Sequence, residues 1–248
     1  MLHTLWNVIC YQPLYNALLF LISVIPGGDV GLAVIALTIV VKLILFPLTQ
    51  KSIVAQLKMK TIEGKINEIK EKITEKTAQS KAIFALYKEN KVNPFSSCLL
   101  IFIQMPIIIA LYMVFIHGFD STPVAVYSFI HAPTTFNLNF FGIVNLAQKS
   151  IYLAVLAGIS QFIQGYLAQG RQTKPTGTDM KAEFQKSMQT QMIYILPLMI
   201  VFIAYKVSAA VALYWITSNI FTIGQELYTR HKIAKSPNYI KAVKELEA

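Results

Sequence analysis

The sequence predicts an all-α polytopic membrane protein with five transmembrane helices, an outer amphipathic helix and a cytoplasmic helical hairpin. Of its 248 residues, 55% are hydrophobic and 14% are charged, which is too little charge to solvate the surface of a soluble protein of this size. Five apolar stretches are about 18 to 24 residues long, enough to cross a hydrocarbon core of roughly 30 Å. These stretches are 30–48, 95–116, 151–169, 188–205 and 208–227.

The basic residues set the expected orientation. Of the 22 Lys and Arg residues, 19 fall in segments 49–93, 170–190 and 228–248. Because Lys and Arg accumulate in cytoplasmic loops, we expect the N-terminus outside and the C-terminus in the cytoplasm. Segment 118–149 is then an outer loop, and 170–187 and 228–248 are a cytoplasmic loop and tail. With no transit-like leader, the expected location is a bacterial cytoplasmic (plasma) membrane.

The net charge of +10 has two interpretations. It either fixes the topology and attracts anionic lipid, or it also brings the cytoplasmic surface to RNA, for instance that of a ribosome. No stacking aromatic motif accompanies the basic residues, so the sequence gives no sign of sequence-specific nucleic-acid binding.

A short apolar stretch, 11–25, precedes the first span. Pro26, Gly27 and Gly28 break it before Asp29, which can cap the next helix. Because a span needs about 20 residues, we interpret this stretch as an interfacial helix on the outer leaflet. A sixth span is the alternative.

Segment 49–93 is expected to form the cytoplasmic hairpin. Isoleucines at 62, 66, 69 and 73 have helical spacing, and a polar break near 74–77 separates them from a second apolar pattern. Two antiparallel helices joined by a tight turn fit this pattern. The solvated lysines Lys65, Lys70 and Lys72 are the candidate recruitment residues.

Lys42 is the strongest functional signal, because it lies within the apolar stretch 30–48. An ammonium against lipid costs several kcal/mol, and no acidic residue in another apolar segment is an obvious partner. One interpretation is that Lys42 snorkels, since it lies about seven residues, or roughly 10 Å, from the cytoplasmic end of the stretch. The other is that it faces a wet, polar cavity.

Polar residues in the other spans favour the cavity. Each of them, taken alone, is explained as a hydrogen-bonding contact between helices worth about 0.6 to 2 kcal/mol. Such contacts do not explain an unpaired Lys, so we expect a hydrophilic site open to the cytoplasm. Its candidate residues are Lys42, Thr38, Gln104, Gln164, Ser218 and Asn219.

Enzymatic chemistry has no support in the sequence. His3, His117, His131 and His231 are scattered without metal-ligand spacing, and no nucleophile–base pair, glycine-rich phosphate loop or Walker motif is present. We therefore expect no catalytic residue, no metal and no cofactor.

Four motifs resemble the YidC/Oxa family of membrane-protein insertases, and the likeness runs from about Tyr11 to Arg230. The matching stretches are Thr38 to Lys42 with Phe46-Pro47-Leu48-Thr49, Leu86 to Asn90 with Val92-Asn93-Pro94, Gln104 to Ile107 with Ala110-Leu111-Tyr112, and Leu213 to Asn219. The resemblance implies five spans, a mobile cytoplasmic hairpin and a groove that is open to cytoplasm and lipid but sealed on the outer side. It also implies that Lys42, where the family usually has Arg, receives hydrophilic parts of a client.

The hypothesis is that nascent membrane proteins enter this groove and leave it for the lipid bilayer along Met105, Tyr112 and Trp215. The ribosome, the signal recognition particle pathway and the Sec translocon are further candidate partners implied by the resemblance. Two competing classes are a small transporter or channel that uses Lys42 as an anion site, and an assembly factor that moves nothing across.

Overall fold

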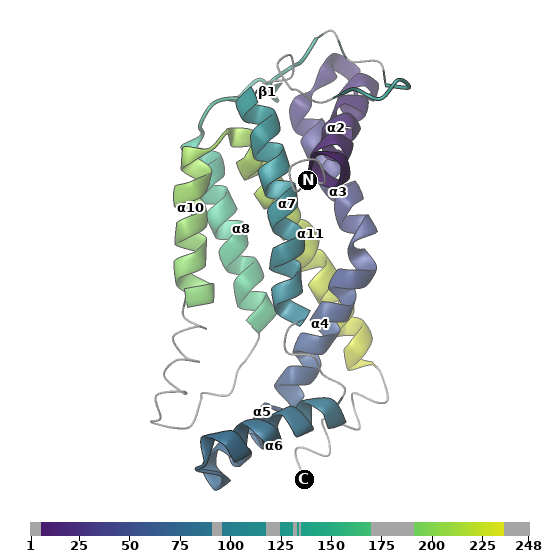
Figure 1. The fold of residues 1–248 in the computed structure, drawn as a ribbon. Coiled ribbons are helices and arrows are strands. Elements are labelled where there is room, and N and C mark those ends of the chain that lie inside the picture. The colour runs from purple at the N-terminus through teal and green to yellow at the C-terminus, as the bar shows by residue number, and fades with distance from the viewer. Residues whose placement is uncertain are drawn as a thin grey trace.

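The described residues of the computed structural model are 6–90, 96–117, 125–130, 133, 135–169 and 191–235, and most of them are helical, as predicted (Figure 1). The expected loop 170–187 and the tail beyond residue 235 lie outside them. In chain order the elements are η1 (Asn7–Tyr11), α2 (Gln12–Val24), η2 (Pro26–Gly28), α3 (Val30–Ile44), α4 (Phe46–Thr61), α5 (Glu63–Lys72), α6 (Lys76–Glu89), α7 (Ser96–His117), β1 (Asn139–Phe140), β2 (Val144–Asn145), α8 (Ile151–Gln169), η3 (Gln191–Ile195), α10 (Leu196–Lys206) and α11 (Ala209–Ala234).

Within the described ranges, two helices, Asn7–Val24 and Ile151–Ala168, are each long and apolar enough to cross a membrane. The bent pair α3–α4 makes a third if it is one span, and Gln104–Ile116 and Ile193–Lys206 are shorter apolar helices. The count of five spans therefore stays a prediction. Two two-residue strands, β1 and β2, interrupt the helical pattern in the loop between α7 and α8.

The first expected span does not run straight through 30–48. Asp29 caps α3 as expected, since its Oδ1 accepts the Leu32 N–H at 2.9 Å. α3 nevertheless ends at Ile44, and α4 leaves it at an angle of 64°. Pro47 explains the break, because a proline lacks an N–H for the preceding turn and disfavours helical geometry in the residue before it.

The N-terminal helix is longer than the stretch 11–25 from which an interfacial helix was expected. η1 continues into α2 without a break, so the helix has 18 residues and reaches the length of a span. Its buried face includes Tyr15, Leu18 and Ile22, which pack into the core of the bundle. Assignment to the outer leaflet remains a prediction.

α11 is the central helix of the bundle and contacts α3, α4, α7, α8 and α10 (Figure 1). Its first turn contains Ala209, Ala210 and Ala212, all buried, which lets neighbouring backbones come close. The helix extends seven residues past the expected span end at 227, to Ala234. α8 and α10 also pack closely, because a side chain at Gly158 would overlap Val201.

The α7–α8 loop is hydrogen-bonded across one end of the bundle. Asn137 accepts the Val30 N–H at 3.0 Å and donates its own N–H to the Gly28 carbonyl. Gly28 has a φ of +61°, and a Cβ there would lie 2.9 Å from the Thr135 carbonyl oxygen, so a glycine is required. Farther along, the Gln148 carbonyl accepts the Ala209 N–H at 2.7 Å at the start of α11.

Asn16 fastens the same loop to α2. Its side chain is buried, donates to the Ala125 carbonyl at 3.2 Å and accepts the Tyr127 N–H at 2.8 Å. The loop is thus held by α2, by the start of α3 and by the start of α11. The described parts of the loop therefore lie across the end of the bundle at which α3 and α11 begin (Figure 1).

α5 and α6 form a helical hairpin inside the expected segment 49–93, around a small core of their own, while the first residues of that segment belong to α4. Ile62 and Ile66 are buried there against Met59, Ile83, Leu86 and Tyr87. Burial raises the pKa of the Tyr87 hydroxyl. The Gln79 amide donates to the carbonyls of Lys70 at 3.0 Å and Ile73 at 2.9 Å, and so caps the end of α5.

Gly31→Ala is expected to destabilise the fold by about 1 to 3 kcal/mol, because the added Cβ overlaps the Phe140 ring. Thermal unfolding in detergent measures the effect. Phe140→Ala should relieve it, so the double variant should lose less than the sum of the two single changes. Additive losses would show that the Phe140 ring does not limit position 31.

Candidate functional site

Lys42 lies in the last turn of α3 and is only 9% exposed. Its Nζ donates to Thr222 Oγ1 on α11 at 3.1 Å, and Thr222 donates in turn to the Ser218 carbonyl at 2.8 Å. Among the described residues, neither of the two ion pairs includes Lys42. The ammonium is therefore held by a neutral hydroxyl.

Thr38 lies one turn before Lys42 and is fully buried. Its hydroxyl donates to the Val34 carbonyl at 2.6 Å, within α3 itself. This back-bond uses the only proton of the hydroxyl, so Thr38 offers Lys42 at most an acceptor.

Gln104 joins α7 to the same region. Its Nε2 donates to the Tyr214 hydroxyl and, at 3.5 Å, to Ser218 Oγ. Ser218 is buried and lies one turn from Thr222 on α11. Lys42 and Thr222 link α3 to α11, and Gln104 and Ser218 link α7 to α11 one turn away. These four residues are the candidate site.

Two expected site residues on α7 and α11 differ in exposure. Met105 is 49% exposed, so it offers an apolar surface beside Gln104. Trp215 is 7% exposed and belongs to the hydrophobic core.

Asn219 and Gln164 are not brought to Lys42 by a described contact. Asn219 Nδ2 donates to Ser160 Oγ on α8 at 3.0 Å, whereas its neighbour Ser218 contacts α7. Successive residues on a helix point about 100° apart, which separates these two side chains. Gln164 Oε1 accepts from Gln161 Nε2 at 3.2 Å on α8.

Gln225 extends the polar contact between α11 and the α3–α4 break. It is buried, and its Nε2 donates to the Phe46 carbonyl at 3.0 Å and to Thr49 Oγ1 at 2.6 Å. The Phe46 carbonyl precedes Pro47, at the break in the helix, and the amide supplies it with a donor. The polar residue at 225 was visible in the sequence, but its partner was not.

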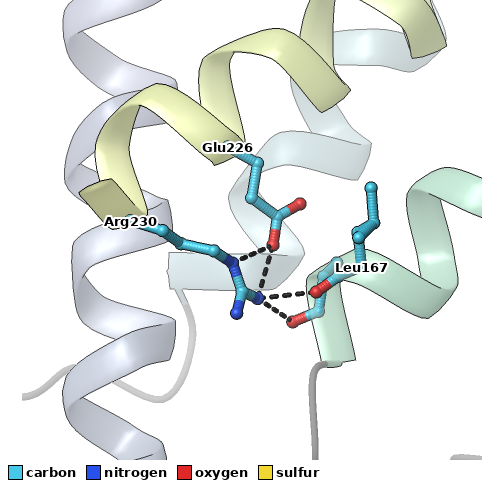
Figure 2. A network of polar contacts seen from close by, with 4 residues as sticks. Leu167, Glu226 and Arg230 are labelled. Carbon is cyan, nitrogen blue, oxygen red and sulfur yellow. Dashed lines mark hydrogen bonds and ion pairs between the residues drawn. The ribbon is translucent and has the colours of Figure 1, made fainter. Parts of the chain in front are cut away.

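Glu226 is the residue that sequence reasoning overlooked. It lies in the fifth apolar segment, where no acidic partner had been noted, and is 3% exposed. Its partner is Arg230 rather than Lys42, with Oε1 2.7 Å from the guanidinium (Figure 2). Arg230 also donates to the carbonyls of Leu167 at 2.6 Å and Ala168 at 3.2 Å, and so caps the end of α8.

The hairpin lysines lie apart from this site, on α5. Lys65 is exposed and Lys70 is half-buried. Lys72 pairs with Glu68 at 3.3 Å, and both side chains are largely exposed, at 75% and 64%. An ion pair in this setting contributes little to stability.

Glu226→Gln is expected to lower the free energy of unfolding by about 1 to 3 kcal/mol, because the amide oxygen can still accept from Arg230 but no longer balances the charge of the guanidinium. Denaturant unfolding in detergent measures it. The matched control is Glu68→Gln, which breaks the exposed pair and should change stability by less than about 0.5 kcal/mol. Equal effects of the two changes would contradict the assignment of a buried clamp.

The family described as "60Kd inner membrane protein" matches residues 21–236. A membrane protein insertase YidC from Clostridium tetani is 33% identical over 216 residues, covering 85% of this chain and 87% of the relative. The YidC of Oceanobacillus iheyensis is 34% identical over 230 residues, covering 90% and 82%. The YidC of Haemophilus influenzae is 33% identical, but the match spans only 36% of that longer relative.

A solved structure, described as an active YidC insertase crystal structure with the first transmembrane domain resolved, is similar in fold. The TM-score is 0.56 at 22% identity, over 88% of this chain and 46% of that chain. At this identity the likeness supports the fold alone. Together with the sequence matches it confirms the resemblance drawn from the four motifs, and the chain belongs to the 60Kd inner membrane protein family, which is the family of the YidC/Oxa insertases.

Proposed function

We propose that the protein is a membrane-protein insertase that receives nascent hydrophobic segments in a hydrophilic, cytoplasm-open groove bearing Lys42 and releases them to the bilayer. The observation that carries the proposal is Lys42 itself, buried among neutral polar groups in a chain whose relatives are named insertases. Nascent membrane proteins and the lipid bilayer are its partners, in a bacterial inner membrane.

Electrostatics supports a receiving role for Lys42. Its described polar partner is the Thr222 hydroxyl, which carries no charge to neutralise the ammonium. An acidic residue in a client tail would gain a charge-assisted hydrogen bond, roughly twice as strong as a neutral one. Polar groups on Gln104 and Ser218 would replace part of the water that the tail leaves behind.

Release to lipid follows from apolar surface. Met105 and Tyr112 lie on the same face of α7, about two turns apart, and both are exposed, which offers a client helix a path beside the polar site. Each square ångström of apolar client surface that leaves water contributes about 25 cal/mol, so the client's own hydrophobicity drives the step. The mechanism requires no nucleotide.

The loop across one end of the bundle supports one-sided access. The α7–α8 loop is tied to α2, α3 and α11 by the contacts of Asn16, Asn137 and Gln148. A client would then enter from the opposite end, where α4 leads to the hairpin. That end is the cytoplasmic one if the excess of basic residues sets the orientation.

The hairpin α5–α6 is the proposed recruitment element. Lys65 and Lys72 are exposed on α5, and the exposed ion pair between Lys72 and Glu68 is weak enough to give way to an anionic partner surface. A ribosome carrying a nascent chain fits that chemistry, and the signal recognition particle and Sec translocon are the other candidate partners.

Lys42→Ala is expected to reduce insertion of clients with acidic outer tails by about ten- to a hundredfold, since a charge-assisted hydrogen bond worth about 1.5 to 3 kcal/mol is lost. Protease protection of client tails in liposomes containing the purified protein measures it. A client with a neutral tail and the variant Lys42→Arg serve as controls, and both should insert nearly normally. Normal insertion of acidic tails by Lys42→Ala would refute the charge-receptor role, and anion flux in the same liposomes would favour a transporter.

Replacing Lys65, Lys70 and Lys72 together by Ala is expected to weaken co-sedimentation with stalled ribosome–nascent chain complexes severalfold at low salt, because phosphate attraction falls with each lost cation. The matched control replaces Lys76, Lys81 and Lys88 on α6, which removes the same charge from the other helix. Equal losses in both variants would show that net charge rather than the α5 face recruits the partner.

A further inference from the structure

The Lys42 ammonium is anchored on α11 through one threonine hydroxyl. Thr222 Oγ1 accepts from Lys42 Nζ at 3.1 Å. A hydroxyl has one proton, and that of Thr222 is donated to the Ser218 carbonyl at 2.8 Å. The oxygen is therefore oriented with lone pairs available to the ammonium, and the contact has a defined direction.

We propose that Thr222 is a positioning residue that holds Lys42 ready for an anionic client segment and determines the preference for acidic tails. This inference rests on the proposed receiving role of Lys42. Thr222 fixes the flexible lysine stem at one place on the α3–α11 seam. It does so without neutralising the charge, which an acidic residue at the same position would do.

The strength of the contact suits a temporary partner. A neutral hydroxyl binds an ammonium less strongly than a carboxylate does, so an entering carboxylate displaces it or joins it on one of the two remaining ammonium protons. Thr222 is half-buried, whereas Lys42 is almost fully buried, so the threonine is the more accessible residue of the pair. After the client leaves, Thr222 can hold the ammonium again.

The neighbouring contacts support this division of roles. Gln104 bonds Ser218 from α7, and Gln225 bonds Thr49 and Phe46 from α11. These neutral pairs hold the helices together around Lys42 but do not contact its ammonium in any described hydrogen bond. The charged contacts of α11, between Glu226 and Arg230, face α8 instead.

The chain contains a matched control on the same helix. Thr217 Oγ1 donates to the Leu213 carbonyl at 2.9 Å, the same back-bond that Thr222 makes to Ser218. Thr217 has no described contact with Lys42. A Thr→Val change therefore removes an equivalent helix bond at both positions, but an ammonium partner only at 222.

The experiment compares two clients that differ only in an acidic or a neutral outer tail, inserted into liposomes by each full-length variant. Thr222→Val should lower the ratio of acidic to neutral insertion by about three- to tenfold, because the ammonium loses the hydroxyl that positions it. Thr222→Ser keeps the hydroxyl and should stay near the parent ratio, as should Thr217→Val. Thr222→Asp should reduce the ratio as far as Lys42→Ala does, because its carboxylate pairs with Lys42 internally.

The outcomes separate this inference from the proposed function. If Thr222→Val leaves the ratio of acidic to neutral insertion unchanged while Lys42→Ala abolishes the preference for acidic tails, the positioning role of Thr222 is overturned. The receptor role of Lys42 is then unaffected. If Lys42→Ala has no effect on the insertion of acidic tails, the receptor role itself is overturned. An equal loss for both clients in Thr222→Val, with a lowered melting temperature in detergent, would mean a purely structural role and would also overturn the inference.

Discussion

Helix α11 binds its neighbours through two separate polar faces, and the rest of the arrangement depends on that separation. Ser218, Thr222 and Gln225 face α7, α3 and the start of α4. Asn219 and Arg230 face α8. A bilayer provides no water for unpaired polar groups, so each of these side chains must keep its partner on the neighbouring helix. These pairs fix the relative position of the helices, which apolar packing alone would not do. The central helix therefore sets the register of the bundle on both sides.

The two faces differ in charge. Toward α8, a buried carboxylate, a guanidinium and two helix-end carbonyls satisfy one another, and removing one member would leave the others unpaired. Toward α3, a single cation contacts a neutral hydroxyl. The first arrangement suits a permanent contact between helices. The second keeps a positive charge that is only partly satisfied, which is the property that a binding site for anions requires.

Sequence patterns predicted helix positions better than side-chain directions. The third expected span, 151–169, has the same bounds as α8, because the apolar stretch ends sharply on both sides. Pro47 indicated a bend after Ile44, but the prediction of a span over 30–48 used only the length of the apolar stretch and missed the bend. Glu226 was missed because a single carboxylate near the end of an apolar segment does not reveal a partner one turn later. Ser218 and Asn219 were grouped, since a sequence gives the angle between neighbours but not which helix each one meets.

Lys42 and Thr222 are 180 residues apart in the chain, and this separation has a consequence for biogenesis. During synthesis the segment that carries Lys42 emerges before Ser218, Thr222 and Gln225, which all belong to α11. The newly made protein must hold a cation in the membrane, without these eventual neighbours, until α11 has been made. A helper already in the membrane, such as an older copy of the same protein, would shorten that exposed interval. The time needed to make the residues between Lys42 and Thr222 is thus the time for which the ammonium lacks its hydroxyl partner.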